Sequence, residues 1–319
     1  KPLINKLNNK KIIQIYRNFE KNLSIDDKFI VAVSGGPDSL ALAFLGKIYS
    51  VKKKLTAKFL IIDHKLREES TKEALKVKKT LKKYSINAEI LTWKGKKPTS
   101  NVQSIARNER YRLLFQKSKK LKVNIILLGH HQDDIFENFF IRILRGSGLK
   151  GLISFKKKTK IENKILLRPL LNSKKEDLIY ISKKVFNFYI TDPSNKNDKY
   201  LRIKVRKMIN ELQKNGLDKK KFNKTIDNLK KSNEVISFYV NENLSNNSFF
   251  SKKHNRLILN KIFFLQPYEV IFRSLTELLR FVGKKYYPVR GKKLENIIND
   301  IENNRFSKAT LGGCIIENV

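Results

Sequence analysis

The sequence contains one cysteine, Cys314, in 319 residues. A single cysteine excludes an internal disulfide framework, a cysteine-rich zinc site and a CxxC redox pair. No stretch offers about 18 consecutive uncharged apolar residues, and residues 1–20 alternate Lys and Asn with aliphatic side chains, so membrane spanning and secretion are disfavoured. We therefore expect a globular protein of the reducing cytoplasm with no membrane partner.

Acidic residues are also scarce, because 29 Asp and Glu stand against 69 Lys and Arg, a net charge of +40. A general excess of lysine, asparagine and isoleucine would leave many of these lysines as ordinary solvated surface. ATP alone would not require so many positive charges, whereas an RNA backbone could use many of them. Nucleic acid is therefore the leading partner.

Hydrophobic residues make up 40% of the chain, enough for a packed core, and its length predicts two domains. Short β-branched runs alternate with helical patterns in the first half, after a lysine-rich helix expected within residues 1–25. The strands are expected at 28–33, 58–62, 88–91 and 124–128, and the helices at 40–50, 71–84, 102–119 and 134–144. This alternation predicts an α/β fold with a doubly wound, mostly parallel sheet.

The alternation stops after Gly151. A hairpin is expected within 153–167, followed by helices at 174–186 and 201–212. We place a domain boundary near Gly216, giving a catalytic domain at 1–215 and a smaller, mainly helical domain at 216–319. The smaller domain is expected to hold helices at 219–242, 267–281 and 292–303, with short strands near 256–259 and 314–316.

A glycine turn joins the first strand to its helix. It reads Ser34, Gly35, Gly36, Pro37, Asp38, Ser39. The exposed N–H groups and the positive end of the helix behind such a turn attract phosphate. A carboxylate is repulsive beside a phosphate cradle unless a metal ion, a cationic side chain or a reacting group lies between them, so Asp38 suggests catalysis. A plain structural turn is the alternative.

Two further clusters carry polar side chains that a ligand could use. Asp63 and His64 follow the second strand, where either could contact nucleotide, the alternative being a helix cap. Arg107 and Arg110 share a helix face and could clamp phosphate, the alternative being a surface ion pair with Glu109.

The strand at 124–128 leads into a second polar cluster, from Gly129 to Asn138. His64, His130 and His131, three of the four histidines, fall at two strand ends, which core packing does not explain. Zinc lacks an evident third ligand at metal-binding spacing, so Mg²⁺ assisting ATP is favoured over it. The acidic groups Asp133, Asp134 and Glu137 could also hold a cationic substrate.

The turn SGGPDS resembles the SGGxDS loop of the PP-loop ATP pyrophosphatase superfamily, and no Walker A pattern is present. Read in order, DHKLREES, ARNERY, LLGHHQDDIFENFFIRILRGSGLKGL, RPLL and DPSN resemble the motifs of the bacterial tRNA(Ile)-lysidine synthase family from about residue 28 to 210. The C-terminal FSKATLGGC is similar to that family's terminal domain. Gly129 and Asn138 depart from the family's motif, because the family usually has alanine and threonine at these two positions.

The resemblance implies an ATP-dependent ligase. It would attach free L-lysine to C2 of the wobble cytidine in tRNA(Ile) with a CAU anticodon, through an adenylated cytidine, releasing AMP and pyrophosphate. The product, lysidine, would switch codon reading from AUG to AUA and identity from Met to Ile.

The same resemblance, together with residue type, suggests roles for the side chains. The turn Ser34–Ser39 would grip the pyrophosphate of ATP, with Asp63, His64 and Arg107 as further ATP contacts and Mg²⁺ as cofactor. The catalytic candidates are Asp38, Arg110, His131 and Asp134. The lysine-binding candidates are Asp133 and Glu137. The tRNA-binding candidates are Lys204, Arg206 and Lys207, together with the domain at 216–319, which the resemblance implies is a tRNA-binding domain.

Two alternatives remain open at this point. A tRNA thiolase of the same superfamily would generally need catalytic cysteines, and Cys314 stands alone near the C-terminus. A non-catalytic RNA-binding protein on the same fold would have no use for Asp38 or for the histidine and aspartate cluster.

Overall fold

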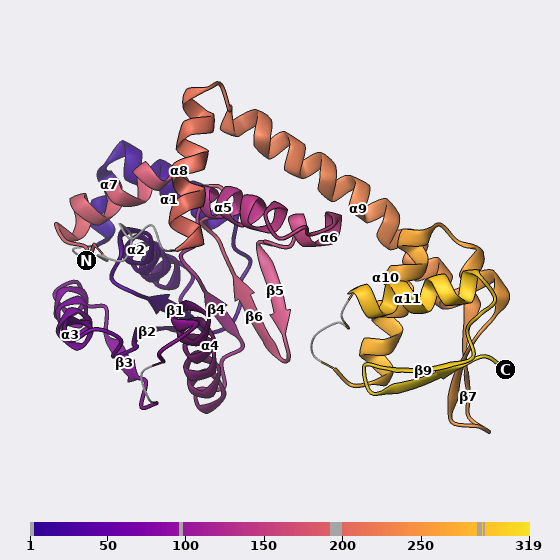
Figure 1. Cartoon of the computed structure of the whole chain (residues 1–319). Helices are drawn as coiled ribbons and strands as arrows, with labels where there is room; N and C mark the ends of the chain where they lie inside the picture. Colours follow the sequence, from indigo (N-terminus) through magenta and orange to yellow (C-terminus); the bar gives the residue numbers. More distant parts are fainter. Residues whose placement is uncertain (1–2, 96–97, 192–199, 286–288, 290) are drawn as a thin grey trace. The chain divides into compact units, whose positions relative to one another are not determined.

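A computed structural model of the chain describes residues 3–95, 98–191, 200–285, 289 and 291–319 (Figure 1). The chain divides into two compact units, Lys1–Leu217 and Asp218–Val319, and this division lies two residues beyond the predicted boundary. Every helix in the described portion of the chain is too short or too polar to cross a membrane.

The first unit is built on a six-stranded sheet. Its strands are β1 (Phe29–Val33), β2 (Ala57–Asp63), β3 (Ala88–Thr92), β4 (Ile125–Leu127), β5 (Lys158–Ile161) and β6 (Lys164–Leu167). They lie in the order β3-β2-β1-β4-β6-β5, all parallel except β5, which pairs antiparallel with β6. The prediction of a mostly parallel α/β sheet is therefore confirmed, and the predicted hairpin joins that sheet through β6.

Helices cover both faces of this sheet. They are α1 (Lys10–Lys21), α2 (Pro37–Lys52), α3 (Glu69–Lys82), α4 (Val102–Lys120), α5 (Gln132–Ile143), α6 (Leu149–Leu152), α7 (Lys175–Phe186) and α8 (Leu201–Lys214). Alternate residues of β1 point to opposite faces, so Phe29 and Val31 enter a core with α1, α2, α3 and α7, while Ile30 enters a core with α4. Figure 1 shows α2 and α4 on opposite sides of the strands.

The second unit combines helices with two hairpins. It contains α9 (Lys219–Asn247), β7 (Ser248–Ser251), β8 (Arg256–Leu259), the 3-10 helix η3 (Lys261–Leu265), α10 (Tyr268–Val282), α11 (Gly291–Glu302), β9 (Lys308–Leu311) and β10 (Cys314–Glu317). Its core gathers Phe263, Leu275, Leu294 and Cys314. The mainly helical class is confirmed, but the sequence patterns missed β7 and β9, since each is four residues long and is completed only by its antiparallel partner.

One further expectation was wrong in detail. Residues 1–25 hold a 3-10 helix, η1 (Ile4–Asn8), and then α1, instead of one continuous helix. The break occurs because the extended backbone of Asn9 places its side chain where it accepts the N–H groups of Lys11 and Ile12 and caps α1.

The connections of the sheet change direction between β1 and β4, and the region outside the carboxyl ends of these two strands is here named the crevice. From β1 the chain moves through β2 to β3 on one side, and β4 lies on the other side of β1. Loops at the carboxyl ends of such strands diverge and leave room for a ligand. The two loops nevertheless start close together, since a Cβ on Gly129 would lie 3.2 Å from backbone atoms of Asp38 and Ser39.

Gly35 fixes the shape of the turn after β1. Its φ is +88°, and its carbonyl oxygen accepts the N–H of Ile190 at 2.9 Å. A Cβ at this position would lie 2.6 Å from Val77 and 2.8 Å from Ile190. Gly36 is different, because its φ is −69° and a Cβ there would meet only the Ser34 hydroxyl, at 4.0 Å.

Gly35→Ala should therefore destabilise the first unit, while its neighbour Gly36→Ala serves as the matched control. A left-handed backbone costs an L residue about 1–2 kcal/mol, and the side-chain clash adds to that. We expect thermal denaturation to show a midpoint lowered by roughly 4 °C or more for Gly35→Ala, and a midpoint close to wild type for Gly36→Ala. Equal midpoints for the two variants would contradict this account of the turn.

Candidate active site

The glycine turn and the start of α2 form a preshaped anion site. Ser39 Oγ accepts the N–H groups of Ser34 and Gly35, both at 3.1 Å, and donates to the carbonyl of Gly36 at 3.0 Å. Gly36 caps α2 without a side chain, and Pro37 occupies the first helical position. The amides of the first turn therefore have no side-chain acceptor and can bind the oxygens of an anion.

Asp38 points into the crevice with one oxygen unpaired. Its Oδ2 lies 3.5 Å from His131 Nε2, while its Oδ1 is buried and has no hydrogen-bond partner. Burial raises the pKa of Asp38, and Asp134 nearby adds to the rise, against the opposing effects of His131 and of more distant cations. A buried carboxylate oxygen without a donor is costly, so Asp38 is the group that a bound cation or donor would satisfy.

His131 links the two loops. His131 is the N-cap of α5, where its ring Nδ1 accepts the backbone N–H of Asp133 at 3.2 Å. The backbone N–H of His131 donates to Asp134 Oδ2 at 2.9 Å. Because Nδ1 is an acceptor, the ring proton belongs on Nε2, which faces Asp38. This nitrogen lies 3.5 Å from Asp38 Oδ2 and 3.7 Å from Asp134 Oδ2, so His131 faces both carboxylates.

Two arginines of α8 neutralise the carboxylates of α5. Arg202 donates to both Asp134 and Glu137, and Arg206 donates to Glu137. Asp134 and Glu137 are buried. Burial opposes ionisation of Glu137, but the two arginines outweigh it and lower its pKa. The predicted lysine-binding residue Glu137 is thus already paired, and the predicted tRNA-binding residue Arg206 turns toward the crevice.

The other two crevice histidines are neutral because of burial and nearby arginines. Burial lowers the pKa of His64 to about 4, with a further lowering by Arg110. Burial also holds the pKa of His130 well below its usual value, and four arginine charges lower it further. These are Arg107, Arg110, Arg168 and Arg202. The Nδ1 atoms of both histidines are buried without a partner.

This clustering of arginines has a chemical consequence. Positive charges gathered near neutral histidines repel one another unless an anion lies among them. Burial also lowers the pKa of Arg110, with Arg107 and Arg202 contributing to the fall. Arg110 thus lies within this group of positive charges, whereas Arg107 is exposed, and Glu109 pairs with Arg112 at 2.6 Å.

The remaining predicted residues lie at the margin of the crevice or outside it. Asp63 is buried and accepts the Lys65 N–H at 3.0 Å and the Thr71 hydroxyl at 2.7 Å, so its side chain secures the turn into α3. Arg107 is exposed and donates to the Tyr111 hydroxyl at 3.1 Å. Asp133 is half-buried in the first turn of α5. The DPSN motif at 192–195 lies outside the described residues.

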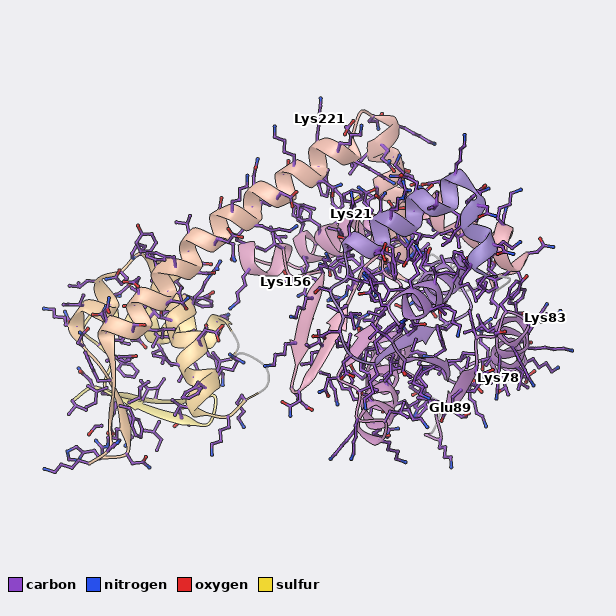
Figure 2. All side chains as sticks on the ribbon, turned by 180° about the vertical axis from the view of Figure 1, so that it is seen from behind. Lys21, Lys78, Lys83, Glu89, Lys156 and Lys221 are labelled. Carbon is purple, nitrogen blue, oxygen red and sulfur yellow. The ribbon has the colours of Figure 1, made fainter. Side chains whose placement is uncertain are left out.

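Basic residues cover much of the first unit's surface. Residues 1–217 hold 50 of the 69 Lys and Arg and 19 of the 29 Asp and Glu. Lys204 and Lys207 are exposed on α8. Figure 2 shows Lys78 and Lys83 at the periphery of the unit, directed outward. This surface suits a large polyanion better than a small anion alone.

Sequence reasoning assigned no role to Arg168 or Arg202. Arg168 is buried and donates to the Lys156 carbonyl and the Thr159 hydroxyl, both at 2.8 Å. Its guanidinium lies over the ring of Phe155, and that ring packs edge-on against His130. For Arg202 a signal existed. Arg202 and Arg206 are four residues apart and Asp134 and Glu137 three, so each pair lies on one face of its helix.

Comparison with known proteins identifies the family. The PP-loop domain family matches residues 5–213. The tRNA(Ile)-lysidine synthase of Orientia tsutsugamushi (strain Boryong) is 37% identical over 316 residues, covering 94% of this chain and 68% of that protein. The synthase of Rhodopseudomonas palustris is 35% identical over 191 residues, 59% of this chain and 55% of that protein. That of Wolbachia sp. subsp. Brugia malayi is 31% identical, covering 91% and 68%.

The chain thus spans between about half and two thirds of the length of these curated relatives. Among solved structures, the U34-tRNA thiolase NcsA from Methanococcus maripaludis aligns with a TM-score of 0.59 and 19% identity, covering 70% of this chain and 79% of that one. This second likeness shows the fold alone. By the match to the domain family and the identity to the synthases, the chain is an ATP-binding PP-loop protein that belongs to the tRNA(Ile)-lysidine synthase family.

Proposed function

We propose that this chain attaches free L-lysine to C2 of the wobble cytidine in a tRNA(Ile) with a CAU anticodon, using ATP and forming lysidine. The observation that carries the proposal is the approach of Asp38, in the first turn of α2 after the glycine turn, to His131 at the start of α5, next to Asp134 and its partner Arg202. The synthase relatives supply the identity of the reaction.

The first step activates a poor leaving group. The cytidine O2 attacks the α-phosphorus of ATP, the bond to the β-phosphate breaks, and pyrophosphate leaves. The turn Ser34–Ser39 and the first amides of α2 would hold that pyrophosphate. Arg110 would stabilise the charge on phosphorus, since a guanidinium in a partly buried crevice acts on developing charge more strongly than in water.

The second step uses the lysine amine. The free ε-amine has a pKa of about 10.4, so the site must bind it neutral or remove a proton. The amine nitrogen then attacks C2, and the bond from C2 to the adenylated oxygen breaks to release AMP. His131 and Asp134 are the predicted bases, and the ring of His131 faces both Asp38 and Asp134.

Mg²⁺ would fit at Asp38. It is usually held in such sites by one or two carboxylates together with substrate phosphates. The unpaired Oδ1 of Asp38 beside the phosphate turn meets that demand. Among the described residues no three His, Cys, Asp or Glu side chains lie close enough to form a metal site of their own. When bound, the ion would neutralise charge on the phosphates.

Substrate binding would divide between the carboxylates and the basic surface. Asp133, which is half-buried at the start of α5, and Glu137, which pairs with Arg202 and Arg206, are the predicted lysine ligands. Lys204 and Lys207 of α8 would hold the tRNA backbone. The target base must leave the anticodon stack to reach ATP, as base-modifying enzymes generally require.

The two alternatives fit the structure less well. A thiolase would need reactive cysteines, whereas Cys314 is buried in the core of the second unit, and burial raises the pKa of its thiol. A non-catalytic RNA-binding protein would gain nothing from burying Asp38 with an oxygen unpaired, because that arrangement destabilises the fold.

The reaction itself can be tested directly. Unmodified tRNA(Ile) with a CAU anticodon is incubated with the chain, ATP and isotopically labelled lysine, and its nucleosides are analysed by mass spectrometry. We expect label in a modified cytidine and one AMP released per lysine incorporated. A matched tRNA without cytidine at the wobble position should remain unlabelled. AMP release without lysine incorporation, or sulfur in the modified base, would contradict the proposal.

Asp38→Asn separates a catalytic role from a structural one. The change removes a negative charge that no donor satisfies at Oδ1, so the midpoint of thermal unfolding should stay the same or rise. Turnover should fall about 100-fold or more, because a group acting at the reacting phosphate is lost. The exposed Asp26→Asn is the matched control and should keep full turnover. An active Asp38→Asn enzyme would refute the assigned role.

The neutral histidines predict a pH effect on stability. His64 has a folded pKa of about 4, set by burial and Arg110 against Asp63 and Glu109, while an unfolded histidine titrates near about 6.5. Between these values the unfolded chain binds more protons, so stability falls as the pH is lowered from about 6.5 to about 4. Urea unfolding across this range should show a smaller loss in His64→Gln than in wild type or in the exposed-site control His254→Gln.

A further inference from the structure

Arg168 carries a buried positive charge that no carboxylate neutralises. The Asp, Glu, Lys and Arg side chains that are buried in the described part of the chain are Asp63, Asp134, Glu137, Arg168 and Arg273. The acidic pair of α5 is bound by the arginines of α8, and Arg273 pairs with Glu269 at 2.6 Å. Arg168 forms no ion pair with any described carboxylate. Because a buried charge without a counter-ion is costly, an anion is expected beside Arg168.

The guanidinium of Arg168 is held in one orientation. Its Nη1 donates to the Lys156 carbonyl and the Thr159 hydroxyl, both at 2.8 Å, and its Cζ lies 5.0 Å from the centroid of the Phe155 ring. The Nε atom is buried and has no hydrogen-bond partner. The Nε–H group is therefore a preoriented donor that an anion can use.

A neutral imidazole lies next to this guanidinium. The Phe155 ring below Arg168 packs edge-on against His130, with 5.2 Å between the ring centroids. Burial holds the pKa of His130 well below its usual value, and Arg168 lowers it further. Its Nδ1 is buried without a partner, and a neutral ring with its proton on Nδ1 supplies a second donor. The two side chains together carry one positive charge, which one carboxylate balances.

Arg168 lies away from the phosphate turn and near α5. It directly follows β6, and β4 lies between β6 and β1 in the sheet. Neighbouring strands are about 5 Å apart, so the ends of β1 and β6 are roughly 10 Å apart. Burial lowers the pKa of Arg168, and Asp134 of α5 is among the groups that oppose this change. The acidic start of α5 and the guanidinium of Arg168 are thus suited to opposite charges of one zwitterion.

The burial of Arg168 favours a small ligand over an RNA phosphate. Arg168 is 5% exposed, whereas Lys204 and Lys207 of α8 are exposed. A free amino acid is small enough to be enclosed almost completely in a pocket, as small-molecule ligands usually are. The backbone of a large RNA remains at the surface, where exposed lysines meet it.

We propose that Arg168 binds the α-carboxylate of the amino acid substrate through its Nε–H, with the neutral ring of His130 as a second donor. The inference rests on the proposed function, which supplies lysine as that substrate. It also assigns Arg168 a part in specificity. An amine without a carboxylate leaves the buried charge of Arg168 unbalanced, so the site selects against it.

The first test uses the wild-type chain alone. L-lysine is compared with L-lysinamide, in which a neutral amide replaces the carboxylate, at saturating ATP and tRNA. We expect kcat/KM to be about tenfold or more lower for L-lysinamide, because a hydrogen bond between charged groups is lost. Equal kcat/KM for the two amines would overturn the proposal, and this comparison does not depend on how well a variant folds.

Arg168→Gln should remove this discrimination. Its kcat/KM for L-lysine should fall about tenfold or more, while kcat/KM for L-lysinamide and KM for ATP and tRNA stay near the wild-type values. Arg273→Gln is the matched control, because Arg273 is also 5% exposed but lies in the second unit and pairs with Glu269. This control should keep the wild-type ratio between the two amines.

Two results with Arg168→Gln would contradict the proposal. An equal loss of kcat/KM for both amines would mean that Arg168 acts only through the structure. A raised KM for tRNA or ATP with an unchanged ratio between the amines would mean that Arg168 contacts a phosphate.

Calorimetric titration of the chain with the two amines separates this inference from the proposed function. If the wild-type chain forms lysidine and uses both amines equally, the carboxylate proposal fails alone. A different result is that no lysidine forms, yet L-lysine binds about tenfold or more tightly than L-lysinamide and Arg168→Gln removes that difference. In that case the proposed function fails and the carboxylate proposal stands.

Discussion

Withdrawing a carboxylate from water costs several kcal/mol unless donors replace the lost hydration, and three carboxylates share the crevice of this protein. Asp134 and Glu137 recover that cost through Arg202 and Arg206. Asp38 recovers only a fraction of it through His131. Among these three carboxylates, Asp38 is thus the one with a buried oxygen that lacks a donor, and that oxygen is where a ligand or its metal ion would be expected to bind.

This balance explains why the first unit extends to Leu217. The sheet and the helices that cover it end with α7, yet Asp134 and Glu137 of α5 form ion pairs with Arg202 and Arg206 of α8. Without α8, two buried negative charges would stand uncompensated beside Asp38. A helix that looks like a basic surface segment in the sequence therefore belongs to the site's electrostatic structure.

The neutral histidines belong to the same arrangement. His64 and His130 lie among arginines, and a protonated ring there would add a further positive charge to a crowded, partly buried region. Burial keeps the rings neutral, so the histidines add no charge to the repulsion among the arginines. Gly129 contributes to this arrangement, because its backbone lies close to Asp38 and Ser39 and so brings the two loops together. The sequence alone gave no reason for a glycine where the family usually has alanine.

The sequence by itself determined the sheet strands, the phosphate turn and the family, because these depend on local signals: β-branched runs, Gly35 with its positive φ, and motifs read in order. It also indicated that the polar residues after β1, β2 and β4 would share one edge, since parallel strands end on the same side. Only the tertiary structure decided which charge pairs with which. The sequence predicted that Glu137 binds lysine and that Arg206 binds tRNA, but the two side chains contact each other. It predicted no role for Arg168 or Arg202. Charge pairing depends on which helices pack together and on how deeply each charged group is buried. A short stretch of sequence does not determine either of these.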